Sequence, residues 1–362
     1  MECRTASAVV AFDFEGASRS RCSIDGERAF TVLVSPEHAP PINPSPWYAF
    51  RYEAEGPGEV AVRIVYLGAR HRYAPVLTIG RQTRAVDVAV ADDGNAVTLA
   101  LPPGAGTVSA QELVGASHYR GALARWRDRA GGELLTIARS HAGRAVEALR
   151  LGNADAPHLV VLLGRQHPPE VTGAIAMESF VDTLGEAFAA DPGLGARYQV
   201  LVVPQINPDG VAEGNWRANL GGVDLNRDWG TFSQPETRAV AQWLSDLPAG
   251  TRPVAMIDFH STNRNLFYVQ GEEANEAGRR FLSEWLEGRE NAFSGYSFTI
   301  ERTNANPGSG TAKNWFNATY GIPAFTYEVA DDADRQGTHS AAAALARAFP
   351  AALDRLVGDG SR

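Results

Sequence analysis

Cysteine is scarce in this 362-residue chain, which contains only Cys3 and Cys22. Two thiols are too few for a zinc ribbon or a disulfide-rich scaffold. They are either two unrelated thiols or a disulfide that fixes the N-terminal segment, and both possibilities stay open from the sequence. A disulfide would indicate an oxidising compartment such as the periplasm, with Met1 standing where a leader was removed, whereas free thiols would indicate the cytoplasm.

Long apolar runs and an excess of positive charge are lacking as well. No run approaches the roughly 18 apolar residues of a membrane span, and residues 1–16 do not form a signal peptide. Acidic residues outnumber basic ones by 42 to 33, which gives a net charge of −9. A protein that binds nucleic acid needs a basic surface, so nucleic acid is not expected as a partner. The composition, 44% hydrophobic and 21% charged, is that of a globular protein.

The first part of the chain, residues 1–110, alternates apolar and polar residues in short runs separated by turns. Such a pattern is typical of β-strands. The expected strands are Ala8–Phe14, Phe30–Val34, Tyr48–Tyr52, Val60–Tyr66, Ala85–Val90 and Ala96–Leu101. Several short strands with little helical periodicity predict a β-sandwich module. Because this part contains no cluster of ligand-type residues, we expect it to be structural or to shape a substrate site.

From residue 111 to residue 362, helical patterns alternate with short apolar runs. The expected strands are His158–Leu163, Tyr198–Val203, Val254–Phe259 and Ala324–Tyr327. The expected helices cover about 172–190, 235–247, 273–287 and 312–319, with an alanine-rich helix after His339. This alternation predicts a doubly wound α/β domain with a mostly parallel, mixed sheet. The predicted architecture is therefore an N-terminal β-sandwich followed by an α/β domain.

Chemically active side chains follow the ends of these expected strands. His167 and Glu170 come after the strand that ends at Leu163, His260 directly follows Phe259, and Glu328 directly follows Tyr327. In open α/β sheets, ligands bind outside the carboxyl ends of the strands. Two histidines and one carboxylate form the ligand set of a catalytic zinc whose fourth position is left for water.

Two arginines follow a turn-forming segment, Asn207–Gly210. Arg217 and Arg227 lie ten positions apart in the loop that this segment begins. The planar guanidinium group suits carboxylates and developing oxyanions, so the pair indicates an anionic substrate group and a charged transition state. The alternative for each arginine is a salt bridge at the surface.

Taken together, these motifs resemble those of the zinc metallocarboxypeptidases, the carboxypeptidase A-like peptidases. The resemblance covers roughly residues 111–357. It rests on His-x-x-Glu at 167–170, Asn-Pro-Asp-Gly at 207–210, Asp-Leu-Asn-Arg at 224–227, His-Ser-Thr at 260–262 and Thr-Tyr-Glu at 326–328. The N-terminal module, with Ser45–Phe50, resembles the module that precedes the catalytic domain in the cytosolic carboxypeptidase-like branch.

The resemblance implies an enzyme that hydrolyses the last peptide bond of peptides or proteins with one Zn²⁺ per chain. It implies that His167, Glu170 and His260 bind zinc and that Asp224 orients His167. It also implies that Glu328 is the general base and acid and that Arg217 polarises the scissile carbonyl. Asn226 and Arg227 would hold the terminal carboxylate. An alternative is a zinc amidohydrolase of N-acyl amino acids, like the desuccinylases and aspartoacylases. A non-enzymatic binding protein is a third possibility, against which the complete residue set argues.

Lys313 carries a prediction about specificity. Counted back from Trp315, it falls near the position that lines the floor of the side-chain pocket in digestive carboxypeptidases. A partly desolvated lysine needs a negatively charged partner, so it predicts a preference for acidic C-terminal residues. The alternative is that Lys313 points to solvent from a short helix. The sequence makes no prediction about the oligomeric state.

Overall fold

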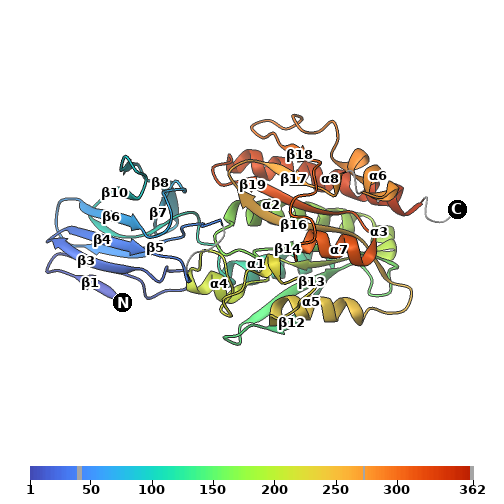
Figure 1. Ribbon diagram of the computed structural model, residues 1–362, viewed down its shortest axis with the longest axis horizontal. Helices are drawn as coiled ribbons and strands as arrows, with labels where there is room; N and C mark the ends of the chain where they lie inside the picture. Colours follow the sequence, from blue (N-terminus) through green and yellow to red (C-terminus); the bar gives the residue numbers. More distant parts are fainter. Residues whose placement is uncertain (39–42, 272–273, 359–362) are drawn as a thin grey trace. The chain divides into compact units, whose positions relative to one another are not determined.

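The computed structural model describes residues 1–38, 43–271 and 274–358 of the chain. The chain forms two compact units (Figure 1). The first comprises Met1–Gly115 together with two short later segments, His167–Pro169 and Asp209–Gly222, and the second comprises the rest. Within the described residues, no helix has the length and apolar character needed to cross a membrane.

The described strands of the first unit form two sheets. One has the order β1 (Glu2–Arg4), β2 (Ala8–Ala11), β5 (Ala49–Ala54), β11 (Gly104–Ser109), β7 (Val76–Ile79) and β8 (Gln82–Ala85). The other has the order β3 (Arg21–Gly26), β4 (Ala29–Val34), β6 (Val60–Tyr66), β10 (Ala96–Leu101) and β9 (Val88–Val90). Along β6, Val60, Val62 and Ile64 are buried and alternate with exposed residues, as the sequence pattern predicts.

A disulfide joins Cys3 of β1 to Cys22 of β3. It therefore connects one strand of each sheet and ties the first residues of the chain to the module. The sequence had left this pairing open.

One expected strand of the module is wrong. The run Ala85–Val90 is two strands, because β8 ends at Ala85 and pairs with β7, whereas β9 begins at Val88 and pairs with β10 in the other sheet. The chain crosses between the sheets at Val86, whose N–H donates to the carbonyl of Pro75. A continuous apolar pattern does not reveal such a crossing.

The second unit is built on an eight-stranded sheet within the described ranges. Its order is β12 (Glu133–Arg139), β13 (Ala145–Leu151), β15 (Tyr198–Val203), β14 (His158–Gly164), β16 (Arg252–Thr262), β19 (Ala324–Ala330), β17 (Leu266–Tyr268) and β18 (Thr299–Glu301). The central strands β15, β14, β16 and β19 are parallel, and antiparallel pairs flank them. Together with the N-terminal sheets, this confirms the predicted fold class.

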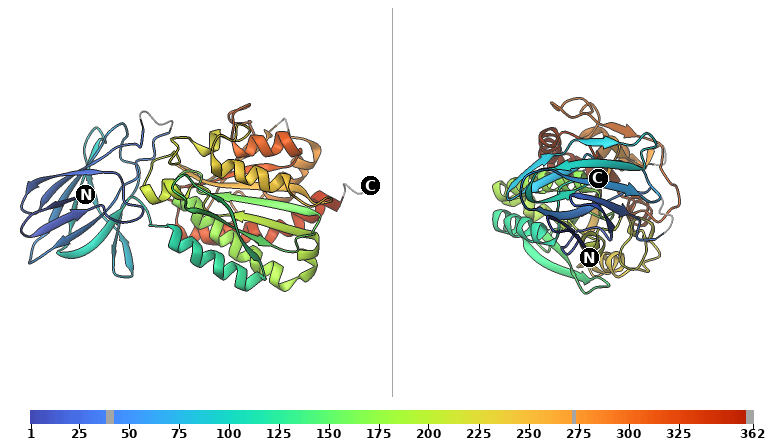
Figure 2. Two further views of the ribbon diagram at one scale, coloured as in Figure 1. Left: turned by 90° about the horizontal axis from the view of Figure 1, so that it is seen from below. Right: turned by 90° about the vertical axis from the view of Figure 1, so that its left-hand side faces the viewer.

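Helices cover both faces of this sheet (Figure 2). On one face lie α1 (Ala116–Ala130), α2 (Val171–Ala190), α3 (Pro192–Arg197), α6 (Glu276–Trp285) and α8 (Arg335–Gly358). On the other lie α5 (Pro235–Ser245) and α7 (Ala312–Tyr320), together with the 3₁₀ helix η1 (Leu225–Arg227). Burial on both faces explains why β14 and β15 are almost continuously apolar.

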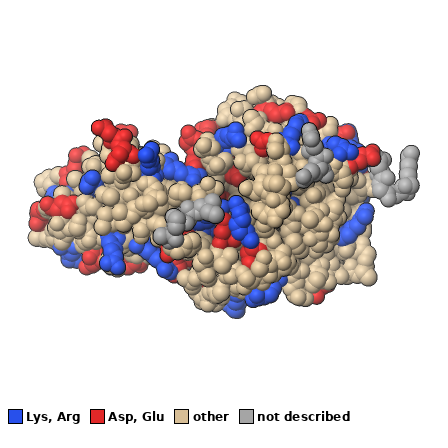
Figure 3. Space-filling view, in the orientation of Figure 1, with Lys and Arg blue, Asp and Glu red and all other residues tan. Residues whose placement is uncertain are grey.

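Charged side chains of both signs are interspersed over the face of the molecule drawn in Figure 3. This mixture accords with the composition, in which 33 basic and 42 acidic residues are spread along the chain.

Candidate active site

The three predicted metal ligands converge. His167 and Glu170 lie in the loop between β14 and α2, and His260 lies on β16. All three side chains are buried, and one potential ligand atom from each lies within 4.8 Å of the others. Residues of loop and strand that are 90 positions apart are thus brought to one point, as the strand-end argument predicts.

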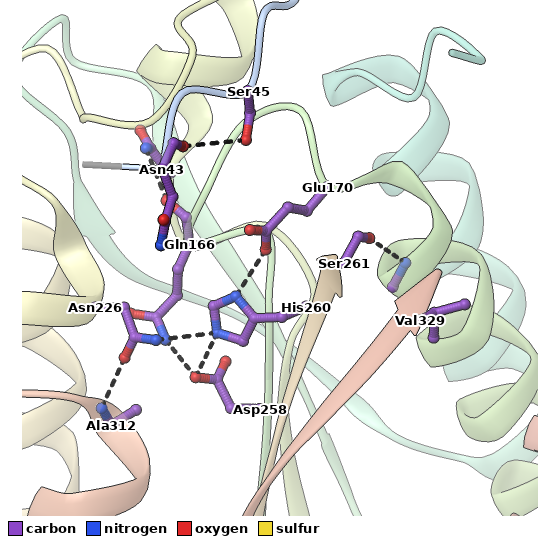
Figure 4. A network of polar contacts seen from close by, with 12 residues as sticks. Asn43, Ser45, Gln166, Glu170, Asn226, Asp258, His260, Ser261, Ala312 and Val329 are labelled. Atoms are coloured by element: carbon purple, nitrogen blue, oxygen red, sulfur yellow. Dashed lines mark hydrogen bonds and ion pairs between the residues drawn. The ribbon is translucent and has the colours of Figure 1, made fainter. Parts of the chain in front are cut away.

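His260 is held between two carboxylates (Figure 4). Its Nδ1 lies 2.7 Å from Oε2 of Glu170, and its Nε2 lies 2.7 Å from Oδ2 of Asp258. The Nδ1 edge therefore faces the other candidate ligands, and the Nε2 edge faces Asp258. A carboxylate on the far nitrogen of a ligating histidine fixes its tautomer and increases its basicity.

The two carboxylates also determine the charge that His260 favours. Burial by itself lowers the pKa of the ring, but the negative charges of Asp258 and Glu170 outweigh burial and hold the pKa well above its usual value. The position therefore stabilises positive charge, either a proton or a metal cation. Because a ligating imidazole must release its proton, metal and proton compete for this ring.

Asp258 is in turn held by Gln166, the residue before the first predicted ligand. Nε2 of Gln166 donates to Oδ2 of Asp258 over 2.6 Å, and Oε1 of Gln166 accepts from Nε1 of Trp229 over 2.9 Å. Sequence reasoning missed both Asp258 and Gln166. Asp258 had a usable signal, since it lies two residues before His260 on a strand and so shares its face.

The N-terminus of α2 is fixed directly against His260. A Cβ on Gly173 would lie only 2.4 Å from the carbonyl oxygen of His260, so glycine is required for this approach. Oγ of Ser261 accepts from the N–H of Gly173 over 2.8 Å and is within 2.8 Å of Oγ1 of Thr172. This packing holds the loop that carries His167 and Glu170 against β16.

Glu328 lies beside His260 in the sheet. β16 and β19 are parallel neighbours, and His260 pairs in register with Glu328. The prediction that both residues follow their strands is wrong, because the pairing continues to Thr262 and Ala330. In both strands the run of apolar side chains ends before these two residues, but the backbone hydrogen bonds of the sheet continue past them.

The predicted carboxylate-binding residues lie at η1. Asp224 caps this helix by accepting the N–H of Asn226 over 2.9 Å. The side-chain oxygen of Asn226 accepts the N–H of Ala312 over 2.9 Å, and its Nδ2 lies 3.3 Å from Nε2 of His260. Nη1 of Arg227 donates to the carbonyl of Asn226 over 2.7 Å. These contacts join η1 to the start of α7 and to β16, whereas the predicted substrate contacts remain predictions.

Arg217 is buried in the loop that follows α4 (Pro208–Glu213), with 7% of its surface exposed. It belongs to the same compact unit as His167 and the N-terminal module. The backbone of this loop is held by Glu37, which could not be predicted because some 180 positions separate it from Arg217. The burial excludes the simple surface salt bridge that the sequence allowed.

Lys313 is also buried, at 3% exposure, near the start of α7. Its Nζ donates to Oδ1 of Asn304 over 2.8 Å and to the carbonyl of Val269 over 3.4 Å. The alternative that Lys313 points to solvent is therefore wrong.

The site fits a catalytic zinc. Two imidazoles and one carboxylate form a donor set that zinc favours, and a three-residue set leaves a coordination position for water. The carboxylate on the far side of His260 completes the arrangement typical of ligating histidines. His167, Glu170 and His260 are thus the residues that would hold the ion.

Comparison with known proteins identifies the family of this chain. Residues 132–347 match the family model of the zinc carboxypeptidases, peptidase family M14. The chain is 29% identical over 227 residues to cytosolic carboxypeptidase 2 of Danio rerio, covering 57% of this chain and 31% of that protein. It is 32% identical over 168 residues to the Homo sapiens protein of that name, covering 43% and 18%. The chain thus spans less than a third of the length of these relatives.

Solved structures share the fold over nearly the whole chain. A metallo-carboxypeptidase from Burkholderia cenocepacia superposes with a TM-score of 0.79 at 20% identity, covering 98% of this chain and 99% of that one. A metallo-carboxypeptidase from Pseudomonas aeruginosa, in complex with (2-guanidinoethylmercapto)succinic acid, superposes with a TM-score of 0.70 at 21% identity, covering 96% and 99%. With a family model matched over more than half of its length, the chain belongs to the zinc carboxypeptidase family.

Proposed function

We propose that the protein is a zinc-dependent carboxypeptidase that removes the C-terminal residue of peptides and prefers an acidic one. The observation that carries the proposal is the convergence of His167, Glu170 and His260 beside Glu328 on the neighbouring strand. A zinc ion at this point supplies a Lewis acid that activates water and polarises the scissile carbonyl.

The chain's own groups supply the remaining chemistry. Glu328 accepts the proton of the attacking water and later delivers it to the leaving amine, which is the role of a general base and acid. The guanidinium of Arg217 stabilises the oxyanion of the tetrahedral transition state, an effect worth about 3 kcal/mol per donor. Asn226 and Arg227 bind the terminal carboxylate and so restrict cleavage to the last residue. Asp224 orients the ring of His167.

The acidic preference rests on Lys313. Its ammonium group is almost fully buried between the oxygens of Asn304 and Val269. A substrate side chain that ends in a carboxylate would interact favourably with this buried ammonium group, because opposite charges attract strongly where water is excluded. Glutamate or aspartate at the C-terminus, or another residue with a second carboxylate, therefore suits this position.

A digest of defined peptides, read by mass spectrometry, tests the activity. We expect zinc-dependent release of single C-terminal residues, fastest for a Glu-terminated peptide. Glu328→Gln is nearly isosteric and should retain zinc while kcat falls by about 10²–10⁴-fold. Hydrolysis of N-acyl amino acids with no action on peptides would contradict the proposal and favour an amidohydrolase.

The specificity is tested with Lys313→Met, which keeps the length of the side chain but removes its charge. We expect kcat/KM for a Glu-terminated peptide to fall about tenfold or more, because a hydrogen bond to a charged group is worth roughly 1.5–3 kcal/mol. The matched Leu-terminated peptide should be spared. Equal losses on the two peptides, or a wild-type preference for Leu, would exclude Lys313 as the determinant.

We also propose that the protein works in an oxidising compartment, with the periplasm as the candidate. The support is the Cys3–Cys22 disulfide, since structural disulfides persist in such compartments. Cell fractionation of the source organism combined with thiol alkylation tests this. Two alkylated, reduced thiols in a cytoplasmic fraction would contradict it.

A further inference from the structure

The loop that carries Arg217 packs against residues from the N-terminal part of the chain. Trp216 is buried, and its Nε1 donates to the carbonyl of Trp47 over 3.1 Å. Gly214 takes a left-handed φ of +63°, and a Cβ there would lie 2.6 Å from the carbonyl oxygen of Ala17. All of these residues belong to the first compact unit. The loop is therefore part of the β-module in its packing, although it lies far along the sequence.

One carboxylate binds three consecutive backbone N–H groups of this loop. Oε2 of Glu37 accepts from Trp216 over 2.7 Å, and Oε1 accepts from Arg217 over 2.9 Å and from Ala218 over 2.5 Å. Trp216, Arg217 and Ala218 are each at least nine-tenths buried. Buried N–H groups need acceptors, and bonds to an ionised acceptor are about twice as strong as neutral ones. Glu37 thus fixes the backbone from which the Arg217 side chain projects.

We infer that Glu37 is a positioning residue for catalysis, which acts by holding Arg217 where the oxyanion develops. The inference rests on the proposed function, since it needs the role of Arg217 given there. An oxyanion donor must be placed within a few tenths of an ångström, and a shift of about 1 Å lowers rate by up to about 10²-fold. Glu37 then affects the reaction through the backbone of the loop that carries Arg217, and both residues belong to the same compact unit.

Glu37→Gln tests the inference in the full-length zinc enzyme. The amide keeps one acceptor oxygen but turns an NH₂ group toward backbone donors, so the three-bond arrangement is lost. We expect kcat to fall 10- to 100-fold, with KM within threefold and zinc content unchanged, because an oxyanion donor acts in the transition state rather than in substrate binding. If Glu37 were purely structural, Glu37→Gln would lower the melting temperature and leave the kcat of the zinc-loaded enzyme unchanged.

Arg19→Gln is the matched control. Arg19 forms a 2.9 Å ion pair with Glu213, so it also links the module to this segment, whereas the backbone N–H groups of residues 216–218 donate to Glu37 instead. We expect its kcat within twofold of wild type. A loss equal to that of Glu37→Gln would show that general docking matters, and would overturn a specific role for Glu37.

A double-mutant cycle with Arg217→Ala shows whether Glu37 acts through Arg217. In that background, Glu37→Gln should change kcat by less than twofold. An undiminished effect there, or a wild-type kcat for Glu37→Gln alone, would overturn the inference. If Glu37→Gln does not fold, Glu37→Asp is used instead, since it keeps the charge but retracts the carboxylate by one methylene, and the same criteria apply.

The proposed function and the positioning role of Glu37 can be refuted separately. A wild-type enzyme that does not cleave peptides refutes the proposed function. An Arg217→Ala variant with kcat within threefold of wild type refutes only the role of Arg217 within it. A fully active Glu37→Gln beside an impaired Arg217→Ala refutes the positioning role alone.

Discussion

Asp258→Asn should weaken zinc binding while leaving the fold intact. Oδ2 of Asp258 accepts from both Gln166 and His260, whereas Oδ1 accepts no hydrogen bond within the described residues. An asparagine can place its amide oxygen at the Oδ2 position and keep both bonds, so the substitution removes charge and little geometry. Hydrogen bonds to charged groups are worth about 1.5–3 kcal/mol and neutral ones about 0.5–1.5. The difference, about 1–1.5 kcal/mol, corresponds to roughly tenfold weaker zinc binding.

The loss should depend on pH in a defined direction. Asp258 stabilises both the protonated ring of His260 and its metal-bound form, and it helps hold the pKa of His260 above its usual value in the metal-free protein. Below the pKa of His260, zinc must displace the proton on this ring, and that proton is held more tightly in the wild type than in the variant, which offsets part of the wild type's higher zinc affinity. Above that pKa the ring is already neutral, so the full difference in zinc affinity appears. The ratio of the zinc Kd of the variant to that of the wild type should therefore increase as pH rises.

Competition with a chromophoric chelator between pH 6 and 9 measures this ratio. Asp228→Asn is the matched control, since Asp228 is a buried aspartate at 2% exposure that accepts from the N–H groups of Ser233 and Gln234 at the start of α5. It should lower the melting temperature without changing the zinc Kd. A zinc Kd for Asp258→Asn within twofold of wild type at every pH would refute the role given to Asp258.

Three further predictions concern the metal and the fold. His260→Ala should lose most of the bound zinc, and an undiminished zinc content by elemental analysis would remove His260 from the ligand set. Gly173→Ala should lower the free energy of unfolding in denaturant by about 1–3 kcal/mol, since its Cβ would lie 2.4 Å from the carbonyl oxygen of His260. Gly185→Ala in the same helix is the control, because the nearest heavy atom to its Cβ lies at 3.7 Å, and it should be neutral or stabilising by up to about 1 kcal/mol. Cys3→Ser should lower stability by about 3 kcal/mol, because the disulfide closes a loop with a sequence separation of 19; unchanged unfolding under non-reducing conditions would contradict this.

The elements with the clearest periodicity could be predicted to the residue. Val60–Tyr66 and Tyr198–Val203 have the expected bounds, because alternation or a continuous apolar run extends over their full length. β3 and β12 were not predicted, and all of their residues are exposed or half-buried, so neither strand shows a buried face in its sequence. Packing in a sheet, which the local sequence does not encode, decides such strands.

The same distinction applies to the site. Its candidate metal ligands are visible because ligating side chains belong to a small chemical set and lie at or just beyond the ends of apolar runs. The residues that hold these side chains in place are not visible in the sequence. Gln166 and Glu37 hydrogen-bond to partners far along the chain, and a glutamine or glutamate in a loop carries no sequence signal until the fold brings its partner to it.

Lys313 is the only lysine of the chain, and the other 32 of its 33 basic residues are arginines. Arginine does not react with acylating or reductive-alkylating reagents, so amine-directed chemistry on this protein reaches one side chain besides the N-terminal amine. That side chain is 3% exposed and hydrogen-bonded to Asn304. Its labelling rate is consequently a built-in measure of how often the start of α7 opens to solvent, and of whether a bound ligand keeps it closed.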